Sequence, residues 1–344
     1  MLQLKNQTPF KANIAVFPNE QGIDTVYVVV KATFALKSKP AVAEEQQLVV
    51  LVDEYWGEPG KSSLKYPSEA HLAKPSTDIL FVGNACAPDQ RPVKQLDVIV
   101  AVGDRRKAIR VYGDRHWEKG WIGIGMSAPA PFQRMPMQYE RAFGGMHQVN
   151  PNQNGTLFEP RNPVGQGFIG KRSKKEANGT LLPNLEDPGQ LIKRPTDCPR
   201  PAGVGAVSPS WEPRKSFAGT YDAAWQKSRA PYLPDDFNPR FFNMAHADLI
   251  CSSYLKGGEP IELLNVSAIG PIRCAVPTCR IDAAVRIAGK IEKPTLNLET
   301  LLLEPPQERL CLTWRASVPC DKKALKVEQV DILLHRLDLQ RAAV

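Results

Sequence analysis

The sequence of 344 residues contains no hydrophobic run of the length that a bilayer requires. Its longest purely aliphatic runs, such as residues 48–52, fall far short of the roughly 20 apolar residues that a transmembrane helix needs. Residues 1–7 also lack the uninterrupted apolar stretch of a secretory signal. These absences predict a cytoplasmic protein without membrane insertion.

Cysteine is scarce, and its number is odd. The seven cysteines are Cys86, Cys198, Cys251, Cys274, Cys279, Cys311 and Cys320. A disulfide framework favours an even count in a smaller chain, so we expect reduced, mostly buried thiols. The last four cysteines leave a zinc site open as an alternative, although the gap between Cys274 and Cys279 is wider than that of a zinc knuckle. We predict no metal and no cofactor.

Catalytic motifs are also lacking. The sequence has no G-x-S-x-G and no H-E-x-x-H, and its five histidines form no close pair. Residues 165–173 match G-x-G-x-x-G and nearly match a phosphate-binding loop, but no strand pattern precedes them and no helix pattern follows. We therefore interpret them as a glycine turn. A hydrolase remains the alternative if folding gathers Glu140, His147 or Asp235 in a cleft.

Acidic residues are outnumbered, which gives a net charge of +8 and a pI near 9.1. Basic runs lie at residues 105–107 and 171–175. Such runs are usually solvated loops, so we predict no nucleic-acid partner. A nucleic-acid binder is the third interpretation, and it would require a steeply salt-dependent affinity.

Strand patterns dominate the two ends of the chain. Hydrophobic side chains alternate along residues 26–36, in a β-branched run without proline. Residues 96–102 repeat the alternation, and we expect 109–112 to return as a hairpin partner across 103–106. Three further candidate strands lie at 281–287, 310–314 and 330–334. The best helical signal, at 221–229, covers only about two turns and stops before Pro231.

The middle of the chain is rich in proline and glycine. Residues 121–240 contain 16 of the 31 prolines and 13 of the 24 glycines, which disfavours regular sheet and long helix. We predict a mainly β fold, either a β-sandwich or a partly closed barrel built from the N- and C-terminal thirds. The predicted single domain, 1–344, has an N-terminal β part (1–120), an irregular insertion rich in proline, glycine and aromatic residues (121–258) and a C-terminal β part (259–344). The aromatic residues indicate that this insertion packs rather than forming a disordered linker.

The middle segment contains a series of short sequence motifs rich in proline, glycine and aromatic residues, which we call phrases. They lie at residues 130–145, 161–168, 182–186, 201–205, 210–214, 221–225 and 230–237. In this order they resemble the type VI secretion-associated domain of unknown function, family 2169. Its signature is similar to P-x-P-F-x-x-x-P-x-x-Y-E-R-A-F-G-G, N-P-x-G-x-G-F, L-P-N-x-E, P-A-G-x-G and W-x-P-R. The resemblance runs from about residue 117 to 259, and residues 313–315 are also in keeping with it.

The resemblance implies a function that composition cannot give. Members of the family are regarded as adaptors or chaperones that bind a type VI secretion effector. The implied partners are a toxin, often one with a PAAR-repeat tip domain, and the valine-glycine-repeat spike onto which it is loaded. The resemblance implies neither a cofactor nor an enzymatic activity.

We select the candidate partner-binding residues from these phrases ourselves. They are Arg141, Phe143, Gly144, Gly145, Asn162, Gly165, Trp211 and Arg214. Arginine and tryptophan commonly dominate interface energies, and glycine turns fix the shape that a partner meets. The alternative for Arg141 is that it satisfies buried carbonyls or a carboxylate within the insertion.

Overall fold

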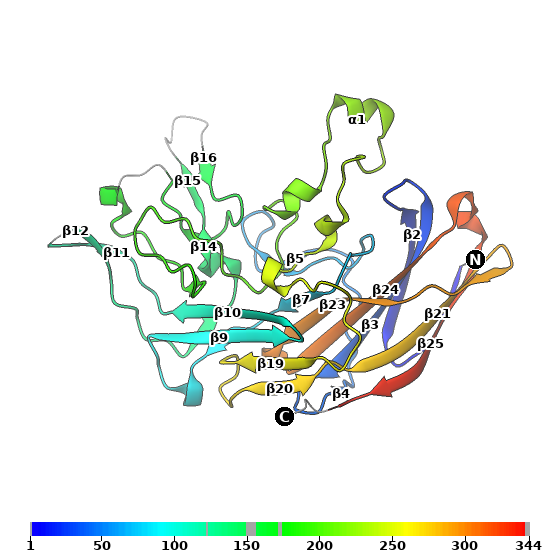
Figure 1. The fold of residues 1–344 in the computed structure, drawn as a ribbon, viewed down its shortest axis with the longest axis horizontal. Coiled ribbons are helices and arrows are strands. Elements are labelled where there is room, and N and C mark those ends of the chain that lie inside the picture. Colours follow the sequence, from blue (N-terminus) through cyan, green and yellow to red (C-terminus); the bar gives the residue numbers. More distant parts are fainter. Residues whose placement is uncertain (1, 122, 149–155, 171–173, 341–344) are drawn as a thin grey trace.

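The computed structural model describes residues 2–121, 123–148, 156–170 and 174–340 (Figure 1). The fold is mainly β, which confirms the predicted class, and none of the described sheets closes into a barrel. The single α-helix of the described residues is α1, Ala223–Ser228. No helix in this part of the chain has both the length and the apolar character to cross a membrane.

The largest sheet has six strands and combines the two ends of the chain. Its path is β2-β3-β24-β23-β7, with β4 added against β3. All pairs are antiparallel except β23 with β7. The strands are β2 (Lys11–Pro18), β3 (Asp24–Ala35), β4 (Ala41–Val42), β7 (Asp78–Phe81), β23 (Asn297–Glu304) and β24 (Arg309–Pro319).

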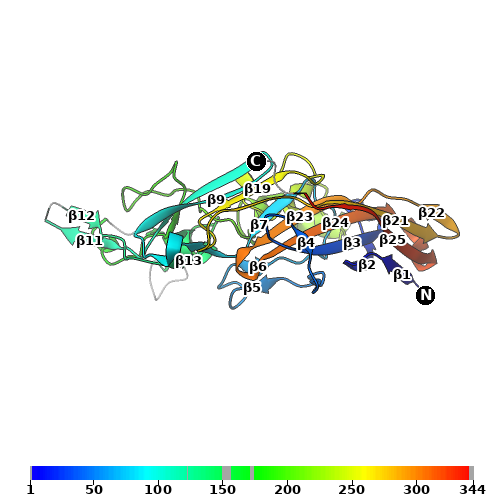
Figure 2. The same ribbon diagram turned by 90° about the horizontal axis from the view of Figure 1, so that it is seen from below.

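Two further sheets also pair segments from both ends. A five-stranded sheet has the order β18-β10-β9-β19-β20, and a four-stranded sheet has the order β1-β25-β21-β22. Seen edge-on, β9 and β19 lie on one side of the layer that contains β3, β23 and β24 (Figure 2). The strands are β1 (Gln3–Gln7), β9 (Gln95–Val102), β10 (Arg105–Tyr112), β18 (Leu185–Glu186), β19 (Pro260–Leu264), β20 (Ile272–Ala275), β21 (Thr278–Ile287), β22 (Lys290–Glu292) and β25 (Val327–Asp338).

One hydrophobic cluster joins the three sheets. It contains Val28 and Val30 of β3, Val98 and Val100 of β9, and Val330 of β25, all fully buried. The alternation predicted for residues 26–36 supplies this contact, because alternate side chains of a strand point to one face. The other face of β3 is covered as well, since every residue from Thr25 to Phe34 is buried. The rest of the molecule therefore packs over the six-stranded sheet from both sides.

The middle segment is irregular, as its proline and glycine content predicts. Its strands have two to four residues and form small two-stranded pairs, apart from β18. These and the other short strands are β5 (Glu54–Tyr55), β6 (Leu64–Tyr66), β8 (Asn84–Cys86), β11 (Trp117–Gly120), β12 (Gly123–Met126), β13 (Arg134–Pro136), β14 (Phe143–Gly144), β15 (Met146–Gln148), β16 (Thr156–Phe158) and β17 (Gln166–Gly167). The 3-10 helices are η1 (Pro88–Gln90), η2 (Tyr139–Arg141), η3 (Lys174–Ala177), η4 (Arg214–Phe217), η5 (Pro239–Phe242), η6 (Ala247–Leu249), η7 (Pro305–Gln307) and η8 (Asp321–Lys326).

Two local expectations need correction. The predicted turn at 103–106 is shorter, because β10 already begins at Arg105 and pairs with Val102. The basic run 105–107 is therefore part of a strand rather than a solvated loop, and Lys107 is buried. The predicted helix at 221–229 is confirmed in a shorter form, with the carboxylate of Asp222 accepting a hydrogen bond from the Trp225 backbone N–H at its start.

Candidate functional site

The phrases of the middle segment fold onto one another. β14 and β17 form a parallel pair in which Phe143 lies opposite Gln166. The backbone N–H of Asn184 donates to the carbonyl of Arg141, and the Gln166 side chain donates to the carbonyl of Leu182 at 2.9 Å. Three phrases that are separate in the sequence therefore form one packed block.

Glycines in this block are required by close backbone approach. Gly144 has φ of +154°, and a Cβ there would lie 2.1 Å from the carbonyl oxygen of Asn162. Gly145 has φ of +113°, and its Cβ would lie 2.7 Å from the oxygen of Gly165. A Cβ at Gly165 would meet the Asn162 amide nitrogen at 2.4 Å. No side chain larger than hydrogen fits at these three positions without displacement of the backbone.

Asn162 and Arg141 act as connectors within the block. The buried amide of Asn162 donates to the carbonyls of Tyr139 and Phe143, at 2.7 and 3.0 Å. Arg141 donates through Nη1 to the side-chain oxygen of Asn184 at 3.0 Å and lies 3.3 Å from the Asp114 carboxylate. Asp114 is exposed and precedes the predicted insertion, so these contacts match the alternative interpretation only in part.

Of the eight predicted partner-binding residues, six are buried. Arg141 and Gly165 are partly exposed, whereas the buried ones are Phe143, Gly144, Gly145, Asn162, Trp211 and Arg214. Trp211 packs edge-on against Tyr139, with ring centroids 5.5 Å apart. Of these buried residues, Arg214 lines the pocket described next, and the other five are placed to shape the surface rather than to contact a partner directly.

An open pocket of about 580 Å³ lies where several phrases meet. Its apolar lining comes from Tyr139, Pro201, Val207, Pro213, Phe217, Ala245, Ala247 and Ile250. Its charged lining is four arginines and one carboxylate, namely Arg161, Arg200, Arg214, Arg240 and Glu212. Asn243 and His246 complete it. An excess of positive charge above an apolar lining is suited to an anionic group that carries apolar substituents.

The four arginines differ in how they are held. Arg161 is neutralised by Glu159, which accepts from its Nε and Nη2 at 2.5 and 2.9 Å. Arg214 is buried and donates to backbone carbonyls, through Nε to Phe241 at 2.8 Å and through Nη1 to Val207 at 2.6 Å. Burial lowers the pKa of Arg214 to about 10, which still leaves it charged at neutral pH.

The remaining two arginines lie at the exposed edge of the pocket. The guanidinium of Arg240 lies 4.9 Å from the ring centroid of Phe217, in a cation–π contact. Arg200 is exposed as well. Among the described residues, no carboxylate lies within ion-pair distance of Arg200, Arg214 or Arg240.

His246 lies at the pocket, beside an ion pair between the buried Lys107 and the exposed Asp248. Lys107 pairs with Asp248 at 2.9 Å, and its Nζ lies 3.4 Å from the Nε2 of His246. Burial first, and the Lys107 charge second, lower the pKa of His246 to about 4. The imidazole is therefore neutral at pH 7 and adds no charge to the pocket.

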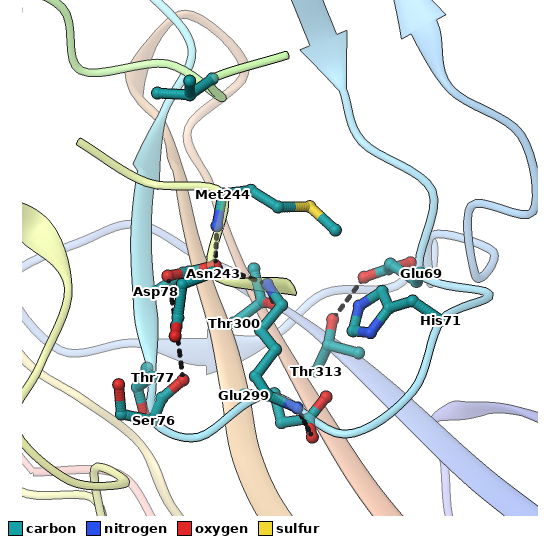
Figure 3. Close-up of polar contacts among 12 residues, drawn as sticks. Glu69, His71, Ser76, Thr77, Asp78, Asn243, Met244, Glu299, Thr300 and Thr313 are labelled. Carbon is teal, nitrogen blue, oxygen red and sulfur yellow. Dashed lines mark hydrogen bonds and ion pairs between the residues drawn. The ribbon is translucent and has the colours of Figure 1, made fainter. Parts of the chain in front are cut away.

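A network of buried charges lies on the six-stranded sheet, and Figure 3 shows part of it, where the Asp78 carboxylate accepts from the Asn243 side chain and the Met244 backbone N–H. Three ion pairs make it up: Lys74–Asp78 at 2.7 Å, Arg315–Glu299 at 2.8 Å and Lys31–Glu69 at 2.9 Å. Every side chain in these pairs is at most 9% exposed. Three cations balance three carboxylates, so the network anchors the covering segments without a net charge.

Sequence reasoning missed this network and the pocket. A signal for the network exists, because Lys31, Glu299 and Arg315 interrupt otherwise apolar strands, and a buried charge requires a partner. Burial of that face could not be read from the alternation alone. The arginines of the pocket come from distant loops, and no spacing in the sequence relates them.

The groups of the hydrolase interpretation lie apart from the pocket. The Glu140 carboxylate accepts from the backbone N–H and the hydroxyl of Ser63, both at 2.7 Å. Asp235 is 88% exposed and pairs with Arg229. His147 lies on β15, and none of the three lines the pocket.

The remaining sequence alternatives are also placed by the structure. All seven cysteines are free thiols, as predicted, and six are buried or partly buried. Within the described ranges, no group of three or more His, Cys, Asp or Glu side chains is arranged to hold a metal ion. In the glycine motif, Gln166 and Gly167 belong to β17, and residues 171–173 lie outside the described residues.

Comparison with known proteins adds one finding. A family model described as an uncharacterized protein conserved in bacteria, DUF2169, matches residues 21–315. No curated protein matches the chain. No solved structure matches it either.

Proposed function

We propose that this chain, which belongs to the DUF2169 family of bacterial proteins, is a non-catalytic adaptor for a type VI secretion effector. In this proposal it binds the effector in the cytoplasm and helps load it onto the valine-glycine-repeat spike. The effector is a toxin, and a PAAR-repeat tip protein is linked to it. The order of phrases from residue 130 to 237 is what suggests this class of function.

The observation that carries the proposal is the pocket of about 580 Å³ with three arginines that have no carboxylate within ion-pair distance among the described residues. It is set in a block whose turns are fixed by glycine and by buried hydrogen bonds. A preorganised surface loses little conformational entropy when a partner binds, and arginine is enriched at interface hot spots. These features support recognition of another molecule.

The proposal is tested in the native cell. The protein is tagged, purified gently from cells that express a type VI secretion system, and analysed by mass spectrometry. We expect a toxin or a PAAR-repeat protein at near-stoichiometric amount. Purification from the same cells without any such partner would contradict the proposal.

A further inference from the structure

We propose that the arginine-lined pocket binds an acidic peptide segment of a partner protein, with carboxylates at the arginines and apolar side chains against the pocket lining. This inference rests on the proposed adaptor function, because it names the chemistry of the segment that the adaptor would bind. In this inference Arg200, Arg214 and Arg240 are the residues that bind the carboxylates of the segment.

Arg214 supplies the first argument. Its side chain is buried, with a relative exposure of 6%, and it donates to the neutral carbonyl oxygens of Phe241 and Val207. The carboxylates that act on its charge, Asp78 and Asp53, lie beyond ion-pair distance. A buried guanidinium without a counter-ion in direct contact is costly, whereas a carboxylate can accept two parallel hydrogen bonds from it. A ligand carboxylate would therefore be more favourable here than at an exposed arginine.

Charge complementarity extends to the exposed edge. Arg240 is oriented by the Phe217 ring, and Arg200 adds a third cation without a carboxylate partner in the described part of the chain. Among the described residues, Glu212 is the only carboxylate that lines the pocket, and it accepts a hydrogen bond from the Ser216 hydroxyl. The pocket therefore has positive charge for more than one ligand carboxylate, and it disfavours a cationic segment.

The apolar lining selects a peptide over a bare anion. Val207, Ala245, Ala247 and Ile250 offer aliphatic surface beside the charges. Tyr139 lines the same pocket, is 97% buried, and its hydroxyl has no hydrogen-bond partner among the described residues. An unmade hydrogen bond at a buried hydroxyl is costly, so a ligand acceptor that reaches it would add affinity. The volume of about 580 Å³ suits a segment of a few residues.

The probe is an acetylated and amidated hexapeptide of alternating aspartate and leucine, titrated into the full chain by calorimetry. The matched probe has asparagine in place of each aspartate. We expect the acidic peptide to bind and the asparagine peptide to bind at least tenfold more weakly, because only the first carries charge to the arginines. Raising the salt concentration should weaken the binding of the acidic peptide, because salt screens the attraction between its carboxylates and the arginines.

Variants locate the site. Two variants remove exposed charges, the single variant Arg240→Gln and the double variant Arg200→Gln/Arg240→Gln. Both should fold normally and lower the affinity for the acidic peptide about tenfold or more. The control Arg336→Gln removes an arginine that is 71% exposed and pairs with Asp338 on β25. We expect no change in peptide binding for this control.

Three results would overturn the inference: equal affinity for both peptides, unchanged affinity in the double variant, or full displacement of the peptide by an equal concentration of inorganic phosphate. The last would mean an anion site without selectivity for peptide. Other results distinguish a failure of the proposed adaptor function from a failure of this inference. Peptide binding without any partner from cells would contradict the function alone, and undiminished capture of a partner by the double variant would contradict the inference alone.

Discussion

Asn162 and the glycines around it define the middle segment at the scale of single residues. The Asn162 amide donates to the backbone carbonyls of Tyr139 and Phe143 and so links neighbouring turns in a part of the chain whose strands have only two to four residues. Gly144 and Gly165 lie against Asn162 so closely that a methyl group would displace it. Packing at these positions therefore requires glycine for steric reasons.

We predict that Gly144→Ala destabilises the protein by at least about 2 kcal/mol, since the new methyl group would lie 2.1 Å from the Asn162 oxygen at a positive φ. Urea unfolding measures the free energy. Gly125→Ala is the matched control, because nothing lies within 4 Å of its Cβ position and the expected change is below about 0.5 kcal/mol. Equal losses in the two variants would contradict the steric account.

His246 predicts a dependence of stability on pH. Its pKa is about 4 in the folded protein and near 6.5 when unfolded, so between these values the unfolded chain binds a proton that the folded chain does not. The free energy of unfolding therefore falls as pH falls, by about 2 kcal/mol from this group between pH 7 and pH 5. Lys107, Asp248, Asp187 and Arg200 are the charged groups that act on it.

The measurement compares the wild type with His246→Gln by urea unfolding at both pH values. The variant should lose about 2 kcal/mol less than the wild type on acidification, because glutamine does not titrate. His335→Gln is the control, since that side chain is 43% exposed and pairs with Asp282. If the free energy of unfolding of His246→Gln fell with pH as much as that of the wild type, the buried imidazole would not be the source of the pH dependence.

At the scale of elements, the excursion around α1 stands out from the body of the fold (Figure 1). Arg229 connects it to the β2–β3 turn, because its Nη2 donates to the carbonyl of Glu20 at 2.8 Å. Within the segment itself, Arg229 Nε donates to the carbonyl of Leu233 at 2.9 Å. The Tyr232 ring also lies near Gly22. Few apolar side chains are buried in α1 itself, so these contacts hold the element.

We predict that Arg229→Ala increases hydrogen exchange at residues 222–233 while the melting temperature changes little, because the lost bonds are local to an exposed element. Hydrogen exchange measured by mass spectrometry reports on both sides of this contact, the segment around α1 and the β2–β3 turn. Lys227→Ala is the control within the same helix, since Lys227 is exposed. Unchanged exchange in Arg229→Ala would mean that other contacts hold α1.

At the scale of the whole molecule, the ends of the chain share their sheets. β24 and β23 lie between β3 and β7, and β25 lies between β1 and β21. Loss of the last strands therefore removes the interior of two sheets at once, with the apolar cluster that joins them. The core depends on pairs that are hundreds of residues apart, such as Val30 with Trp314.

We predict that a chain ending at residue 294 shows no cooperative unfolding transition, because it lacks β23, β24 and β25. Circular dichroism during urea titration measures this. As a control, replacement of residues 222–233 by a short glycine-serine linker should keep a single cooperative transition. Cooperative unfolding of the truncated chain would show that the remaining strands form a core of their own.

The sequence by itself determined the mainly β class and several strands, because alternation of side chains follows from strand geometry alone. It also determined the irregular middle, since proline fixes φ and removes a backbone donor, while glycine loses the most conformational entropy when it is held in a strand or helix. Burial of both faces of β3, with Lys31 in an ion pair, could not be read from alternation. Neither could the gathering of Arg200, Arg214 and Arg240 at one pocket. Only the tertiary structure decided these features, because they depend on which distant segments cover each surface.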